Sequence, residues 1–180
     1  MSQDELVDIV DEIGNFLEVV FKREAHEKGL LHKCVIANVI DSRGRWLLTR
    51  PSKNRQDMGQ YVSPMGGHVS AGESDIDALR RELMEELGLS DFKYELAGKA
   101  ILDRHVIGRH ENHVFIVYKV FSNVKPILNH EAESCKYFTV EELTKELKEN
   151  PQLFGDAFHF VVKNIYPNLL IPEGSPRGAL

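Results

Sequence analysis

Apolar residues near the start of the chain recur at three- and four-residue steps. They are Leu6, Ile9, Val10, Ile13, Leu17 and Val20. This spacing is typical of a helix that buries one face. We therefore expect one or two helical segments with a break at Gly14. They would form an N-terminal helical extension over residues 1–30, ahead of a main domain over residues 31–168.

The next apolar runs predict a β-hairpin. Residues 34–40 (CVIANVI) are typical of a buried strand, and residues 46–49 form a second run. The DSRG sequence between them, at 41–44, is typical of a turn. The segment that follows is expected to form a loop over 50–60, an extended piece over 61–63 and a turn at Gly66 and Gly67.

The second half of the chain alternates strands and helices without an internal repeat. We expect strands over 94–102, 112–121 and 136–138, and helices over 75–87, 140–147 and 154–166. The first two of these strands are separated by a polar, histidine-bearing turn region and should pair. The irregular alternation favours an α/β domain, a mixed sheet with helices on its faces. The Pro- and Gly-rich end is expected to be a flexible tail over 169–180.

The segment GHVSAGESDIDALRRELMEELGL, from Gly67 to Leu89, concentrates the candidate chemistry. Ser74 and Asp77 form a helix-opening pair, and Gly88 suits the left-handed conformation that ends helices. At roughly 100° per residue, the helix places three carboxylates on one face. They belong to Glu82, Glu85 and Glu86.

Like charges on one helix face repel each other, so this cluster costs helix stability unless a cation offsets it. Mg²⁺ prefers oxygen ligands and suits a few carboxylates combined with substrate phosphate oxygens. The alternative is a solvated acidic face, which is the usual meaning of clustered glutamates. We favour the cation because other residues of the segment stand in a fixed register with the cluster: Gly67, Glu73, Arg81 and Gly88.

The complete spacing, G-x5-E-x7-R-E-(apolar)-x-E-E-x-G-(apolar), resembles the signature of the Nudix hydrolases. The resemblance implies an α/β/α sandwich that hydrolyses a diphosphate bond with Mg²⁺ or Mn²⁺. It implies that Glu82, Glu85 and Glu86 bind the metal and act in catalysis, and that the Gly67 carbonyl is a further ligand. Glu73 and Arg81 would form a structural ion pair. The general base differs between members of the family, and we favour Glu82.

The surroundings of this segment are similar to a Nudix branch that includes type I isopentenyl-diphosphate isomerase. The similarity lies in REAHEKGLLH (23–32), LLTR (47–50) and GGH (66–68). It implies a second metal or substrate site at His32, His68 and Glu111, with His26 one residue out of register. His113 stands where the isomerase has the acid that transfers a proton. Gly66 stands where the isomerase has its catalytic cysteine, which argues against isomerisation because glycine cannot move a proton.

Several other polar residues are candidates for binding. His26, His32, His68, His110 and His113 could form a softer metal site, since imidazole suits Zn²⁺, or each could hydrogen-bond locally. We expect the remaining histidines, His105, His130 and His159, to be structural. The cations of the loop after the second strand could bind phosphates or simply be solvated: Arg50, Lys53 and Arg55. Glu131 and Glu133 could add a carboxylate, although an exposed acidic loop is the simpler interpretation.

Composition limits the partners that we expect. The 180 residues fit one domain, and the net charge of −6, with no sustained basic run, gives no sign of binding to a nucleic acid polymer. The chain has only two cysteines, Cys34 and Cys135, too few for a disulfide framework. The acidic N-terminus is no secretory signal and no run is long enough to cross a membrane, so we expect a cytoplasmic protein. The N-terminal extension could pack against a second copy to make a homodimer.

The sequence therefore predicts Mg²⁺-dependent hydrolysis of a diphosphate bond in a nucleoside diphosphate derivative or related metabolite. One alternative is an isopentenyl-diphosphate isomerase-like enzyme with altered chemistry. Another is a non-catalytic Nudix module that senses a nucleotide.

Overall fold

The computed structural model describes residues 5–53, 55–106 and 108–171. Its strands are β1 (Leu6–Val10), β2 (Phe16–Phe21), β3 (His32–Ile40), β4 (Trp46–Pro51), β5 (Met65–His68), β6 (Lys93–Val106), β7 (Arg109–Phe121) and β8 (Ala132–Phe138). Its helices are α1 (Lys22–Lys28), α2 (Asp75–Leu87), α3 (Val140–Glu149) and α4 (Asp156–Ile165), with 3₁₀ turns η1 (Pro151–Leu153) and η2 (Pro167–Leu170). None of the helices in these ranges is long and apolar enough to cross a membrane.

Strand β3 organises a mixed sheet. It pairs in parallel with β7 along its whole length, from His32 opposite His113 to Ile40 opposite Phe121. On its other side it pairs with β5 near its start and with β4 near its end, both antiparallel. The predicted β3–β4 hairpin and β6–β7 pair are confirmed. All nine residues of β3 are buried or nearly so, as expected for a central strand.

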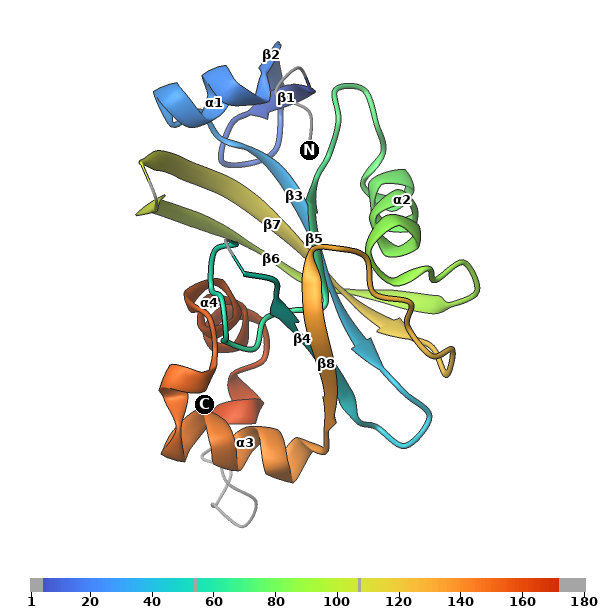
Figure 1. Ribbon diagram of the computed structural model, residues 1–180. Coiled ribbons are helices and arrows are strands. Elements are labelled where there is room, and N and C mark those ends of the chain that lie inside the picture. The colour runs from blue at the N-terminus through green and yellow to red at the C-terminus, as the bar shows by residue number, and fades with distance from the viewer. Residues whose placement is uncertain (1–4, 54, 107, 172–180) are drawn as a thin grey trace, which may run out of the picture.

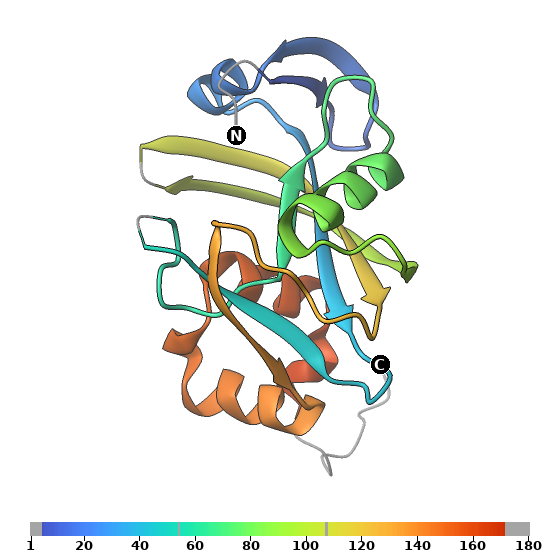
Figure 2. The same cartoon turned by 45° about the vertical axis from the view of Figure 1, so that its right-hand side comes forward.

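Helices cover both faces of this sheet (Figures 1 and 2). On one face, Leu79, Leu83 and Leu87 of α2 pack against alternate residues of β3 and β7. On the other, α3 and α4 pack against the intervening residues, with Phe158 and Val162 fully buried. The expected α/β class and α/β/α arrangement are confirmed.

The expected helix at the N-terminus was wrong, because residues 6–10 and 16–21 are strands. They form the antiparallel hairpin β1–β2, and Ile9 joins it to the sheet opposite His32. The turn uses Gly14 at a φ of 91°, a conformation available to glycine. Val7 and Ile9 are buried on alternate positions, and the run is rich in β-branched residues. The steps of three and four residues were too few to exclude a strand. Within residues 5–30, the only helix is α1.

Three other expectations also need correction. Gly66 and Gly67 lie within strand β5, because both pair with β3, and do not form a turn. The polar region after residue 102 continues the β6–β7 pair, with His105 opposite His110. Leu169 is buried in the core, so the tail expected from 169 does not begin there; residues 172–180 lie outside the described residues.

Candidate functional site

Helix α2 presents the acidic cluster as the sequence predicted. It spans Asp75–Leu87, Ser74 accepts a hydrogen bond from the Asp77 amide, and Gly88 ends it at a φ of 64°. The side chains of Leu79, Leu83 and Leu87 hold one face of the helix in the core. The opposite face therefore carries its glutamates at the edge of a hollow beside the sheet.

Arg81 forms hydrogen bonds to several groups around this helix face. Its guanidinium donates two hydrogen bonds to Glu73, at 2.9 and 2.8 Å, and a third at 3.0 Å to the carbonyl of His68. It also donates to Glu82 at 2.6 Å. The hydrogen bonds to Glu73 hold the pKa of Arg81 above its usual range, although burial opposes the shift. The structure thus brings together the pair Glu73 and Arg81, which ties the loop before α2 to strand β5.

Glu82 lies directly against the backbone of Gly67. A Cβ atom built on Gly67 would come within 2.0 Å of the Glu82 Cδ, so only glycine leaves room for this carboxylate. Glu82 is buried, and burial raises its pKa although Arg81 opposes the shift. Glu85, by contrast, is exposed and 4.0 Å from Arg81.

Glu86 has the most perturbed carboxyl group of the cluster. Burial, followed by the nearby Glu82 and Glu131 carboxylates, raises its pKa to about 9. A divalent cation would favour the charged form and offset this repulsion. The donors offered here are oxygens, from Glu82, Glu85, Glu86 and the Gly67 backbone. This set fits a hard ion such as Mg²⁺ or Mn²⁺.

The residues that flank the N-terminal hairpin, Glu5 and Lys22, form a contact that the sequence did not indicate. Glu5 accepts a hydrogen bond from Ser70 at 3.2 Å and forms an ion pair with the buried Lys22. It lines the same hollow of about 540 Å³ as Glu82, Glu85 and Glu86. Expecting a helix over residues 6–20 left no reason to bring either residue near the acidic cluster.

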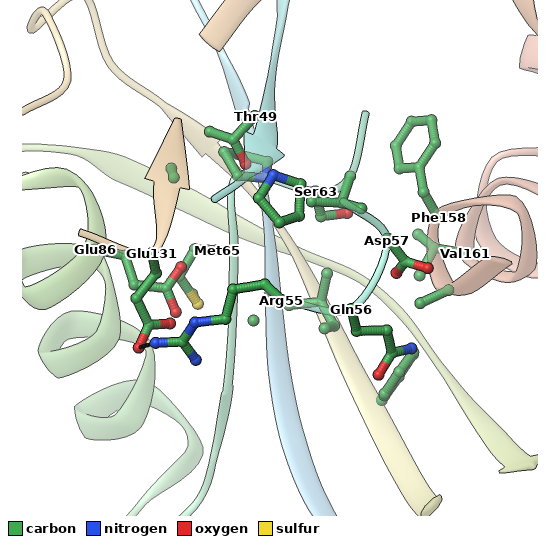
Figure 3. Close-up of a pocket in the computed structure, with 18 of the residues that line it drawn as sticks. Thr49, Arg55, Gln56, Asp57, Ser63, Met65, Glu86, Glu131, Phe158 and Val161 are labelled. Atoms are coloured by element: carbon green, nitrogen blue, oxygen red, sulfur yellow. Dashed lines mark hydrogen bonds and ion pairs between the residues drawn. The ribbon is translucent and has the colours of Figure 1, made fainter. Parts of the chain in front are cut away.

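A cavity of about 350 Å³ adjoins this hollow and shares Glu86 and Glu131 with it. Figure 3 shows these two carboxylates at one end and Phe158 and Val161 of α4 at the other, with Asp57 beside them. Ile36 and Phe115 from the sheet also line the cavity. One end is thus suited to a charged, metal-bound group and the other to an apolar or planar group.

The expected phosphate-binding cations separate into different environments. Both Arg55 and Lys53 are exposed, but only Arg55 of the two lines the cavity, where it pairs with Glu131 at 2.7 Å. Arg50 lies in strand β4, not in the loop, and its guanidinium stacks over Tyr61 at 4.3 Å. Arg104 and Arg109, from the β6–β7 pair, also line the cavity, and no sequence pattern indicated them.

Four histidines meet beside this cavity, and two of them, His26 and His68, line it. The four are His26 of α1, His32 of β3, His68 of β5 and His113 of β7, and one ring nitrogen from each lies within 4.8 Å of the others. We call this group the histidine tetrad. Burial is the main cause that lowers the pKa of His32 to about 4 and of His113 to about 2, so the rings are neutral at neutral pH.

The other predicted members of this site are not part of the tetrad. Glu111 accepts hydrogen bonds from Arg104 at 2.8 Å and lies 3.7 Å from Arg109. His110 stacks on His105 and hydrogen-bonds to Asp103. Of the histidines expected to be structural, His130 lines the hollow beside the carboxylates and His159 bonds to the Pro151 carbonyl. Glu133 is exposed.

Neither cysteine is placed to act as an acid or base beside Gly66. Cys34 is buried in β3 opposite His68, and burial raises its pKa well above the usual value, so it stays a thiol. Cys135 is exposed on β8. The strand position that faces the cavity at Gly66 therefore carries no proton-transfer group of its own.

Comparison with known proteins agrees with this arrangement. The model of the NUDIX domain matches residues 30–156. The chain belongs to the Nudix family. That match contains β3, β5, α2 and β7, which carry the carboxylates and three of the four tetrad histidines; His26 lies just before it.

Relatives within the family have two different activities in their names. An isopentenyl-diphosphate Delta-isomerase of Serratia proteamaculans is 28% identical over 92% of this chain and 93% of its own length. An uncharacterised Nudix hydrolase of Streptomyces coelicolor is 39% identical, over 49% of this chain and 50% of its own. The crystal structure of DR0079 from Deinococcus radiodurans covers 90% of this chain and 99% of its own, with a TM-score of 0.71 and 21% identity, which shows the shared fold.

Proposed function

We propose that this Nudix protein hydrolyses a diphosphate bond in a nucleoside diphosphate derivative or related metabolite, with Mg²⁺ or Mn²⁺ as cofactor. The observation that carries the proposal is the position of Glu86. This half-buried carboxyl, with its raised pKa, lies where the acidic cluster of α2 opens into a cavity with an apolar far end.

Glu82, Glu85, Glu86 and the Gly67 carbonyl would hold the metal. A metal bound there supplies Lewis-acid polarisation of the phosphate and lowers the pKa of a bound water. Arg55 and Arg104 would bind phosphate oxygens, a task for which the planar guanidinium is suited. We assign the general base to Glu82, because Arg81 and the Gly67 backbone fix its position and burial raises its pKa toward the working pH.

The rival activity is an isomerase-like reaction on isopentenyl diphosphate. It is favoured by the similarity to an isomerase over 92% of the chain. It lacks an acid at the reacting position, because Gly66 has no side chain, Cys34 is a buried thiol and His113 belongs to the tetrad. A non-catalytic nucleotide sensor is the third alternative, and the retained carboxylates argue against it.

The test is hydrolysis of a panel of nucleoside diphosphate derivatives, with and without Mg²⁺. The Glu85→Gln and Glu86→Gln variants are compared with Arg80→Lys, an exposed substitution on the same helix. We expect metal-dependent release of phosphate-containing products and its loss in the two glutamine variants only. Inactivity across the panel, or full activity in both glutamine variants, would refute the proposal. Formation of dimethylallyl diphosphate from isopentenyl diphosphate without hydrolysis would establish the rival, and binding without turnover would establish the sensor.

A further inference from the structure

The histidine tetrad is not satisfied by hydrogen bonds among its own members. His32 directs Nδ1 to the Leu30 carbonyl at 2.8 Å, so that nitrogen donates and Nε2 carries the lone pair. This Nε2 is buried and has no hydrogen-bond partner among the described residues. A buried acceptor without a partner is costly, which indicates that something else binds it.

Two of the distances between ring nitrogens match those between metal ligands, and all four rings offer a nitrogen within 4.8 Å of the others. His26 Nε2 lies 3.3 Å from both His68 Nε2 and His113 Nε2. One ring N–H can satisfy only one of these two neighbours. In a tetrahedral zinc site with Zn–N bonds of about 2.0–2.1 Å, two ligand nitrogens are separated by about 3.3–3.4 Å.

We propose that His26, His32, His68 and His113 together bind one Zn²⁺-class transition-metal ion in a closed, all-nitrogen site that is separate from the carboxylate site. Four neutral imidazoles with no carboxylate among them disfavour Mg²⁺ and favour a softer divalent ion. Glu111, which lines the cavity together with His26 and His68, is paired with Arg104 and lies 3.7 Å from Arg109. With an acid at position 113 the site would combine oxygen and nitrogen ligands, whereas with His113 all four ligands are nitrogens.

A site with four protein ligands leaves no position for substrate, which is the property of structural zinc. Each ligand comes from a different element, and three of these elements are strands of the sheet. The fourth, α1, is a short helix whose preceding hairpin supplies Glu5 to the acidic hollow, with Lys22 as its first residue. The ion would therefore fasten the N-terminal segment to the sheet.

The experiment uses the full chain, stripped with a chelator and then titrated with Zn²⁺ or Co²⁺ alone. We expect one equivalent of Zn²⁺ to bind and to raise Tm, as required for a ligand that binds only the folded state. Co²⁺ should give the intense visible absorption of a tetrahedral complex, and Zn²⁺ should displace it. Absence of binding, or a weak six-coordinate Co²⁺ spectrum, would overturn the closed site. Binding without a rise in Tm would overturn the structural role.

Two sets of variants locate the ion. The double variant His32→Gln/His113→Gln should lose stoichiometric Zn²⁺ binding and the rise in Tm, whereas His159→Gln, away from both sites, should keep both. Should the double variant not fold, the single variant His26→Gln on α1 is compared with His159→Gln in the same two measurements. Retained binding in the folded tetrad variant would overturn the assignment.

The triple variant Glu82→Gln/Glu85→Gln/Glu86→Gln distinguishes this inference from the proposed function. It should still bind one Zn²⁺ with the tetrahedral Co²⁺ spectrum, although it cannot hydrolyse diphosphates. Loss of the bound equivalent in this variant, with its fold intact, would show that the ion belongs to the carboxylates and would overturn the inference. Failure of the panel assay with Zn²⁺ binding intact would refute the hydrolase alone.

Discussion

The Glu82 carboxylate occupies the space that a side chain at Gly67 would need. A Cβ on Gly67 would lie 2.0 Å from Glu82 Cδ and 2.1 Å from its Oε1. Gly67 sits in the sheet and Glu82 on the helix packed against it, so the first glycine of the motif and its central glutamate depend on each other. The same contact puts the Gly67 backbone beside the carboxylate group that would bind the metal.

Replacing Gly67 by Ala should therefore displace Glu82 and reduce kcat for the diphosphate substrate by on the order of 100-fold, comparable to the removal of a positioned catalytic group. The Gly98→Ala variant is the control, because a Cβ there meets only the side chain of Ile165, at 3.0 Å from its Cδ1, and Gly98 lines neither the cavity nor the hollow. Steady-state kinetics at saturating Mg²⁺ would compare the two. An equal loss in both would mean that the contact with Glu82 is not the cause.

The second prediction concerns Arg81, which donates to Glu73 through both Nε and a terminal nitrogen. Lysine cannot reproduce this planar, two-pronged contact. Arg81→Lys should lower the free energy of unfolding by about 1–3 kcal/mol, because the partly buried Glu73 and the His68 carbonyl lose their donors. Denaturant unfolding would measure it, with the exposed Arg80→Lys as a variant expected to change little.

The third prediction is a pH dependence set by Glu86. Its pKa in the folded, metal-free protein is raised from 4.5 to about 9, so between these values the folded protein holds a proton that the unfolded chain has released. Stability of the metal-free protein should therefore fall as pH rises from 4.5 toward 9. Denaturant unfolding across this range would show it, and Glu86→Gln should flatten the curve.

The same shift has a consequence for metal binding. Mg²⁺ must displace the Glu86 proton, so its affinity should rise with pH up to about 9. Calorimetry in buffers of different ionisation enthalpy should detect the release of close to one proton for each Mg²⁺ that binds at neutral pH. An affinity that is flat across this range would contradict the assignment of Glu86 as a ligand.

Local sequence patterns were sufficient to predict an element when residues within that element determine its geometry. The helix with Glu82, Glu85 and Glu86 was predicted with its cap at Ser74 and its end at Gly88, because these signals act within one or two turns. The strand β3 followed from a continuous apolar run. The N-terminal hairpin was missed because its strands are stabilised by pairing with β3 and by packing beneath α1, which are contacts between distant residues.

The residues of the site could likewise be predicted from the sequence only where they lie close together in one segment. His26 and His113 are 87 positions apart and meet only because β3 pairs in parallel with β7 and α1 packs against that strand. The sequence indicated His32 and His68 through a family resemblance, and it grouped Glu111 with them. Side-chain packing decided otherwise, because Arg104, from the neighbouring strand, pairs with Glu111 and no sequence pattern reports that register.

The last prediction compares Arg55 and Lys53, two cations of one loop that the sequence did not distinguish as candidates for phosphate binding. Arg55 lines the cavity beside Glu86 and pairs with Glu131, whereas Lys53 in the same loop does not line the cavity. Arg55→Ala should raise KM for the diphosphate substrate about 10-fold or more with a smaller effect on kcat, because a charge-assisted contact to phosphate is worth about 1.5–3 kcal/mol. Lys53→Ala should leave both constants within about twofold, since an exposed charge in water contributes little. Steady-state kinetics on the best substrate of the panel would decide it. Equal changes in the two variants would show that the loop acts through net charge alone, and a kcat effect confined to Arg55 would move its role from binding to chemistry.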